Sequence, residues 1–459
     1  MDQSTKSALF GAIKLKKDIS LSNYYSIIFH NIILGFFLNG TELLQQLLLS
    51  DPDYYDIIPK KAIKVNADIT LFDLLSRLSL AALYGSLIDK LGRKKMIMCG
   101  YVLIALGICL FPIRGYFHNL DSLFPWFYIA RFIYANGSSI VLLMPFIADY
   151  IEDESKGKAT GINAIALASG FLFGTTSIKE LYNTEMNLKY VCLIVAGFLF
   201  MFGMAYSSFL KGGSEYYKVI PEIDESDTSI TSSQIEKETK ITFAYIKQIM
   251  KERPWISVSF VFALLNGANL GIVTQILNFF VENLGTDVPE NLGAQMVQYA
   301  NIAGVLSTIV FGLMLDYTSP VYIATPVILL GLSMYSFTWV IKDPYNVFLI
   351  FIALVAGMSY SSCQLLMNYL GFVYYPGVAR GRLYAMANLI SFCGNLLITV
   401  IGGNLVNYVN QYSPFYLIAV CTFAGGIIFA NIYVKRIRTK KKSKRSKIRT
   451  ESEPLLNPA

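Results

Sequence analysis

The sequence predicts an all-α polytopic membrane protein with about twelve transmembrane helices in two six-helix pseudo-repeats. The first observation is composition: 54% of the 459 residues are hydrophobic and only 15% are charged, whereas a soluble chain carries about 25% charged residues. The second is that apolar windows of about 20 residues, long enough to cross the hydrocarbon core as helices, recur along the whole chain. The third is that short patterns of the first half recur in the second. Helices are expected because lipid offers the backbone polar groups no other partner.

The apolar windows divide the chain into five parts. The predicted spans are 24–49, 67–88, 95–113, 122–149, 157–178, 189–210, 255–281, 291–315, 320–341, 346–374, 382–408 and 414–435. They form two predicted bundles, 24–210 and 254–435, preceded by a tail of residues 1–23. The charged, Ser/Thr-bearing segment 211–253 is predicted to be a linker. Residues 436–459 form a strongly basic tail.

The positions of lysine and arginine predict the orientation. With the N-terminus inside, 29 of the 38 Lys and Arg residues fall in inner segments, 7 fall in outer loops, and Arg77 and Arg131 lie within spans. Positive residues accumulate on the cytoplasmic side of membrane proteins. Both termini are therefore predicted to be cytoplasmic. The excess positive charge is expected to face the inner leaflet, and nucleic-acid binding is not predicted.

Several function classes are disfavoured by residue type. The chain has two histidines and six cysteines, and all six cysteines fall in apolar segments. No metal-ligand spacing, disulfide framework or P-loop occurs, so no metal, cofactor or ATP-driven step is predicted. The lack of a nucleophile–base pattern argues against an enzyme.

Three short patterns repeat between the halves. Gly85 and Asp89 at the end of the second span correspond to Gly312 and Asp316 at the end of the eighth. The stretch SSIVLLM (138–144) corresponds to SSCQLLM (361–367), and KGKATG (156–161) corresponds to RGRLYA (380–385). Similar offsets indicate one six-helix unit used twice in the same orientation. Parallel repeats place the transport site near the midplane between the halves.

The stretch GSLIDKLGRKK (85–95) resembles the loop motif between helices two and three of the major facilitator superfamily. Arg131, Gly137, Pro145 and Asp149, followed by KGKATG, resemble the fourth helix of that superfamily and the loop after it. Ala135 departs from the fourth-helix pattern, and the second half lacks the Gly-Arg-Lys run after Asp316. The resemblance implies the major facilitator fold and a transporter that works by alternating access.

The resemblance also implies a conformational latch between the halves on the cytoplasmic side. The latch residues would be Gly85, Asp89, Gly92, Arg93, Lys94 and Asp149. An ion pair that breaks and reforms suits a two-state element. The alternative interpretation is that these positive charges only hold the loop inside.

Four ionisable residues are predicted to lie within spans: Glu42, Asp73, Arg77 and Arg131. The helical rise per residue places them at similar depth in the first bundle, and burying ionisable side chains in lipid costs free energy. In one interpretation Glu42 carries a proton, and Arg131 or Arg77 tunes it or binds an anionic group. In the other, Asp73–Arg77 and Glu42–Arg131 are static ion pairs. Both interpretations are open from sequence.

Amides at helical spacing predict a polar cavity that suits a hydroxylated or amide-bearing solute. The candidates are Asn39, Gln46, Asn266, Asn269, Gln298, Asn301, Gln364, Asn368, Asn388 and Asn395. The alternative role of each is to hold neighbouring helices together.

The predicted function is secondary transport of a small polar organic solute, coupled to protons, by a monomer in the lipid bilayer. A uniporter, or a transporter-like receptor or assembly subunit, is the alternative. The tail sequence ESEPLL, with Glu451, Leu455 and Leu456, resembles an acidic-dileucine signal bound by adaptor complexes. It predicts an endosomal, lysosomal or vacuolar membrane, with the plasma membrane as the alternative.

Overall fold

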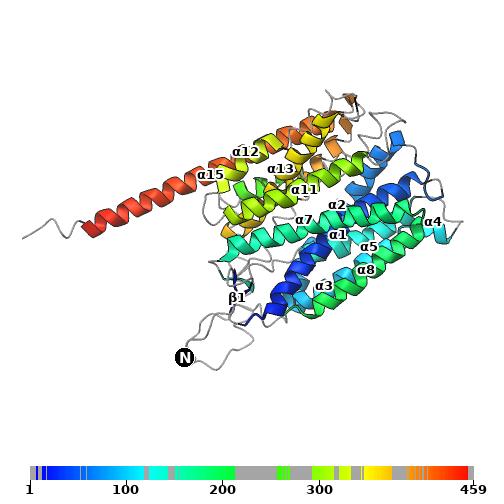
Figure 1. The fold of residues 1–459 in the computed structure, drawn as a ribbon, viewed down its shortest axis with the longest axis horizontal. Coiled ribbons are helices and arrows are strands. Elements are labelled where there is room, and N and C mark those ends of the chain that lie inside the picture. Colours follow the sequence, from blue (N-terminus) through cyan, green and yellow to red (C-terminus); the bar gives the residue numbers. More distant parts are fainter. Residues whose placement is uncertain are drawn as a thin grey trace, which may run out of the picture.

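The computed structural model describes residues 7–8, 13–16, 18–51, 53–57, 59–117, 123–142, 150–152, 155–211, 256–261, 263–265, 267–268, 292–314, 320–331, 343, 346–374, 390–391, 393–398, 400–402, 404–405, 408–410 and 412–452. Long helices run side by side through most of them (Figure 1). Among the described residues, four helices are long and apolar enough to cross a membrane: Leu21–Leu49, Lys158–Asn183, Leu188–Ser208 and Ser413–Ile432.

The first half contributes seven helices to the described part of the chain. They are α1 (Leu21–Ser50), α2 (Pro59–Leu91), α3 (Arg93–Leu110), α4 (Ile113–Tyr116), α5 (Trp126–Leu142), α7 (Lys156–Asn183) and α8 (Leu188–Ser208). A capping box starts α1: the Asn23 backbone N–H donates to Ser20 Oγ at 3.2 Å, and the Ser20 N–H donates to Asn23 Oδ1 at 2.9 Å. Helix α2 begins earlier than the span predicted from residue 67, at Pro59. Proline suits the first helical turn, so the helix can start at Pro59, before its apolar part begins.

Close backbone contact joins α1 to α7. A Cβ added to Gly35 would lie 2.1 Å from the Leu167 carbonyl oxygen, and one added to Gly170 would lie 2.0 Å from that of Ile32. Only glycine permits this approach at both positions. Helix α3 packs against α5 and α8, and α2 packs against α5. Helix α5 thus packs between α2 and α3, with one face buried in the first half.

The second half is described by α11 (Leu292–Met314), α12 (Pro320–Gly331), α13 (Val347–Tyr374) and α15 (Ser413–Ser452), with helical stretches within 256–268 and 390–405. Helix α11 packs on α13, and α12 packs between α13 and α15. Helix α15 projects beyond the bundle (Figure 1). The basic tail is thus helical as far as Ser452, because lysine and arginine favour helix and no proline occurs before Pro454.

The two halves meet where α7 contacts α11 and α13. Gly161 on α7 faces Gly312 on α11, and a Cβ added to Gly161 would lie 2.8 Å from Gly312 Cα. Further along α7, Ala164 packs with Phe311 and Leu365. This line of contacts leads from one end of the bundle toward its centre.

The N-terminal tail contains a short antiparallel pair of strands, β1 (Ser7–Ala8) and β2 (Ile13–Lys14). No strand was expected in residues 1–23. The alternation of Ile13 and Leu15 with Lys14 and Lys16 is the period-two pattern of a strand with one buried face. Both Ile13 and Leu15 are fully buried.

Candidate functional site

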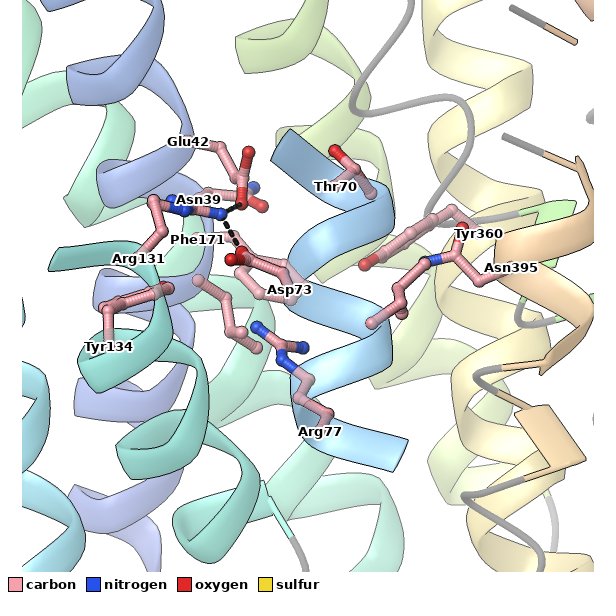
Figure 2. Close-up of a pocket in the computed structure, with 12 residues that line it drawn as sticks. Asn39, Glu42, Thr70, Asp73, Arg77, Arg131, Tyr134, Phe171, Tyr360 and Asn395 are labelled. Carbon is pink, nitrogen blue, oxygen red and sulfur yellow. Dashed lines mark hydrogen bonds and ion pairs between the residues drawn. The ribbon is translucent and has the colours of Figure 1, made fainter. Parts of the chain in front are cut away.

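A cavity with about 640 Å³ of empty space, part of it open to solvent, lies between the two halves (Figure 2). Helices α1, α2, α5 and α7 supply most of its wall, and the second half adds Tyr360 and Asn395. The lining residues are Leu38, Asn39, Glu42, Thr70, Asp73, Leu74, Arg77, Arg131, Tyr134, Phe171, Tyr360 and Asn395.

Arg131 on α5 is the centre of the charged wall. Its side chain is 1% exposed, and its Nη2 donates both to Asp73 Oδ2 on α2 and, at 3.4 Å, to Glu42 Oε1 on α1 (Figure 2). The two carboxylates differ in environment, because the Asp73 side chain is 5% exposed and that of Glu42 is 23% exposed. One guanidinium therefore holds three helices together through one buried and one accessible carboxylate.

Several polar atoms of this group have no hydrogen-bond partner among the described residues. They are Asp73 Oδ1 and the Nε and Nη1 atoms of Arg131. The Arg131 guanidinium also lies 4.9 Å from the ring centroid of Tyr134 and 5.5 Å from that of Phe111. Cation–π contacts offset part of the cost of burying the charge. The Nε and Nη1 atoms of Arg131 can still donate hydrogen bonds, and Asp73 Oδ1 can still accept one, within this site.

The ion pair between Glu42 and Arg131 considered from sequence is present, and the same guanidinium also pairs with Asp73. Asp73 on α2 is joined to Arg131 on α5, and Glu42 is the second acceptor of the same guanidinium. Arg77 lies one turn further along α2, with its guanidinium on the side of Asp73 (Figure 2). Sequence spacing favours local i,i+4 pairs. Helix packing gives Asp73 a partner on another helix.

The opposite wall is aromatic and polar. The rings of Phe171 on α7 and Tyr360 on α13 pack edge to face, with centroids 6.0 Å apart. The contacts between the halves that begin at Gly161 and Gly312 thus reach the cavity at Phe171 and Tyr360. Asn39 and Asn395 are both buried and line the same cavity. Donors and acceptors from both halves thus surround the space between them.

The other predicted amides are placed differently. Gln46, Gln298 and Asn301 are half-buried in their helices and are not among the lining residues of this cavity. Gln364 and Asn368 lie on α13, but their side chains are outside the described part of the structure. Asn266, Asn269 and Asn388 lie outside the described residues.

The predicted latch is described in part. Gly92 separates α2 from α3 at φ 83°, a backbone conformation that favours glycine. Arg93 is buried, and Lys94 Nζ donates to the Ser208 carbonyl oxygen at 2.5 Å. Gly85 lies within α2, the side chains of Asp89 and Glu451 fall outside the description, and so do all of Asp149, Leu455 and Leu456.

Sequence reasoning missed several lining residues. Thr70 lies three residues before Asp73, and Tyr134 lies three residues after Arg131, so each occupies the same helix face as a charge that was identified. Extending the polar stripe by one turn would have found both. Phe171 and Tyr360 carry no such signal, because aromatic residues are common throughout the spans.

Comparisons with known proteins agree with this architecture. A sequence model of the Major Facilitator Superfamily matches residues 69–391. The magnetosome protein MamH of Paramagnetospirillum magneticum is 20% identical over 375 residues, covering 80% of this chain and 81% of MamH. Multidrug resistance protein 2 of Bacillus subtilis is 21% identical over 246 residues, covering 52% of this chain and 54% of that protein.

Solved structures share the fold. The fucose:proton symporter FucP of E. coli superposes with a TM-score of 0.62 at 14% identity, over 90% of this chain and 98% of FucP. The proton:xylose symporter XylE, bound to 6-bromo-6-deoxy-D-glucose, gives 0.63 at 14% identity, over 88% and 94% of the two chains. The predicted all-α fold in two halves is confirmed, and the structural neighbours are transporters and not enzymes. The chain is an integral membrane protein that belongs to the Major Facilitator Superfamily.

Proposed function

We propose that this transporter carries a small polar organic solute, coupled to protons, by alternating access of a cavity between its halves. The observation that supports it most is the single buried guanidinium of Arg131, shared by two carboxylates of unequal exposure in a cavity that both halves line. Ionisable residues at such depth mark ion or substrate pathways in membrane proteins.

Glu42 is the carboxylate that we assign to the proton. It is the more exposed of the two and the more distant from a donor, at 3.4 Å. Protonation of Glu42 leaves Asp73 and Arg131 as a neutral buried pair. Protonation of Asp73 would instead remove the closest counter-charge of a guanidinium that is 1% exposed. Breaking a buried pair costs about 3–5 kcal/mol, so the proton favours Glu42.

The lining supports a hydroxylated or amide-bearing solute. Asn39 and Asn395 both donate and accept hydrogen bonds, and the rings of Phe171 and Tyr360 offer a flat apolar surface. FucP and XylE, which share the fold, are symporters of fucose and xylose. Their likeness supports hexoses, pentoses and polyols as the first solutes to test.

The deciding experiment uses proteoliposomes and a solute panel of sugars, polyols, neutral amino acids and one lipophilic cation. Uptake is measured with and without a pH gradient, and then as counterflow exchange. Glu42→Gln mimics the protonated carboxyl group. We expect this variant to lose gradient-driven accumulation and to retain counterflow, because exchange needs no net proton movement.

The matched control is Asp73→Asn, which removes the other carboxylate of the same group. We expect it to reduce driven uptake and counterflow together. Equal loss of both activities in Glu42→Gln would contradict the proton assignment, and insensitivity of wild-type uptake to the pH gradient would favour a uniporter. Exchanging the charges of Glu42 and Arg131 is not a useful rescue, because it would place a carboxylate beside Asp73.

We further propose that both termini are cytoplasmic and that the protein resides in an endosomal, lysosomal or vacuolar membrane as a monomer. The distribution of lysine and arginine supports the orientation. The ESEPLL sequence supports the location through adaptor binding.

A further inference from the structure

The N-terminal segment Ile13–Ser20 is attached to the connection between α5 and α7. Leu15 pairs with Ile151 in an antiparallel bridge. The Lys16 N–H donates to the Tyr150 carbonyl oxygen at 3.0 Å, and the Glu152 N–H donates to that of Lys14 at 3.1 Å. The backbone of this segment therefore extends a strand onto the loop that precedes α7.

Two further contacts hold the segment at this end of the bundle. The Lys14 N–H donates to Oγ of Ser155 at 3.0 Å, and Ser155 immediately precedes the first residue of α7. The Asp18 carbonyl oxygen accepts from Lys211 Nζ at 2.6 Å, just beyond α8. One short segment thus forms hydrogen bonds with Ser155, just before α7, and with Lys211, just after α8.

The side chains of the segment are buried as well. Leu15 and Ile19 have no exposed surface, and neither do Tyr150 and Ile151 of the loop. The first residues of a domain usually fray unless they are held by pairing or burial. Here both apply, so the segment is part of the folded unit.

The attachment point lies close to the contact between the halves. Gly161 is six residues after Ser155, about 9 Å along α7 at the helical rise per residue. Gly161 touches Gly312 of α11, and the line of contacts continues through Ala164 to Phe171 at the cavity. A helix moves as a rigid element over such a length, so a shift of its first turn also shifts Gly161 at this contact.

We infer that the segment Ile13–Ser20 is a strap that positions the first turn of α7 and thereby favours the arrangement in which α7 and α11 touch. In that arrangement contacts between the halves lie along α7 between its first turn and the cavity. Release of the strap shifts the equilibrium toward the arrangement in which this end is open. The role depends on the alternating halves and not on which solute or proton site is used.

The test measures the separation of the halves directly. Spin labels are placed at Lys95→Cys on α3 and Met314→Cys on α11, both exposed, in full-length protein whose six native cysteines are replaced. Pulsed electron paramagnetic resonance in nanodiscs then gives the populations of short and long distances. The protein needs no solute for this measurement.

The strap is released by Lys16→Pro, which removes the N–H that donates to Tyr150. Leu15 is already extended, so a following proline fits. The matched control is Lys16→Ala, which removes the side chain and keeps the N–H. A second pair is Ser155→Ala, which removes the acceptor for Lys14, and Ser155→Thr, which keeps a hydroxyl group.

We expect Lys16→Pro and Ser155→Ala each to raise the ratio of long to short distances about fivefold, as expected for loss of one hydrogen bond. Lys16→Ala and Ser155→Thr should match the parent. The inference is overturned if the first two variants leave the ratio unchanged, or if each control shifts it as much as its partner. If Lys16→Pro is not monodisperse, the Ser155 pair decides alone.

Discussion

At the scale of single residues, the chemistry of this protein concentrates on Arg131. Its guanidinium is 1% exposed and has one buried and one accessible carboxylate as partners. The burial of a charge makes its closest partner important for folding, and Glu42 is the more exposed of the two partners. We therefore propose that Asp73 has a structural role and that Glu42 carries the proton.

This inequality predicts unequal stability of two conservative variants. Asp73→Asn should lower the free energy of unfolding by about 3 kcal/mol, because it leaves a buried guanidinium without its nearest charge. Glu42→Gln should lower it by about 1 kcal/mol or less, because the Glu42 side chain is 23% exposed. Thermal unfolding of both variants in the same detergent measures the difference. Equal destabilisation would mean that Arg131 depends on the two carboxylates alike.

At the scale of helices, contacts through glycine determine how closely the elements approach. Gly35 and Gly170 bring α1 and α7 together within one half, and Gly161 and Gly312 bring α7 and α11 together between the halves. The first pair lies inside one half. The second pair lies between the two halves that alternating access, as proposed above, would separate, so we expect it to affect a conformational equilibrium as well as stability.

Substitution of Gly161 by alanine tests the second pair. The added Cβ would lie 2.8 Å from Gly312 Cα, so α7 and α11 must move apart. Overpacking of this kind costs about 1–3 kcal/mol, and we expect the closed arrangement to be depopulated accordingly. The Lys95 and Met314 spin labels measure the change in population.

The control for this substitution is Gly197→Ala on α8. A Cβ at Gly197 meets no atom within 4 Å, so the same chemical change should leave the distances unaltered. It should also stabilise the helix slightly, by about 0.5–1 kcal/mol. A Gly161→Ala protein that behaves like Gly197→Ala would show that the contact between α7 and α11 is looser than the structure indicates.

At the scale of the whole molecule, the two tails are arranged differently relative to the bundle. The N-terminal segment folds back onto the first half, whereas α15 continues past the bundle to Ser452 (Figure 1). Beyond it lie Leu455 and Leu456 of the predicted sorting signal. In the sequence, the proposed signal directly follows a helix that projects from the bundle.

Exchange of both leucines for alanine should therefore move the protein to the cell surface without changing its fold. Microscopy of a tagged protein, with surface biotinylation for quantity, measures the shift. Asn457→Ala, just outside the signal, is the control and should keep the original location. If the double variant keeps it too, the dileucine assignment is wrong.

The sequence alone determined the class of the protein and the charged residues that lie within its membrane spans. Apolar windows reveal spans because lipid excludes unpaired backbone groups, and charges within them are rare enough to be conspicuous. Glu42, Asp73, Arg77 and Arg131 were found in this way, and all four line one cavity. The helical rise sufficed to place them at a common depth.

Only the tertiary structure decided which charges pair and which residues from the second half meet them. Asp73 bonds Arg131 across two helices, Tyr360 and Asn395 reach the same cavity, and Leu15 pairs with Ile151 far along the chain. Helical periodicity gives the face and depth of a residue within its own helix. The neighbour of that face depends on how the helices pack, and that packing is the sum of many weak contacts between segments distant in sequence.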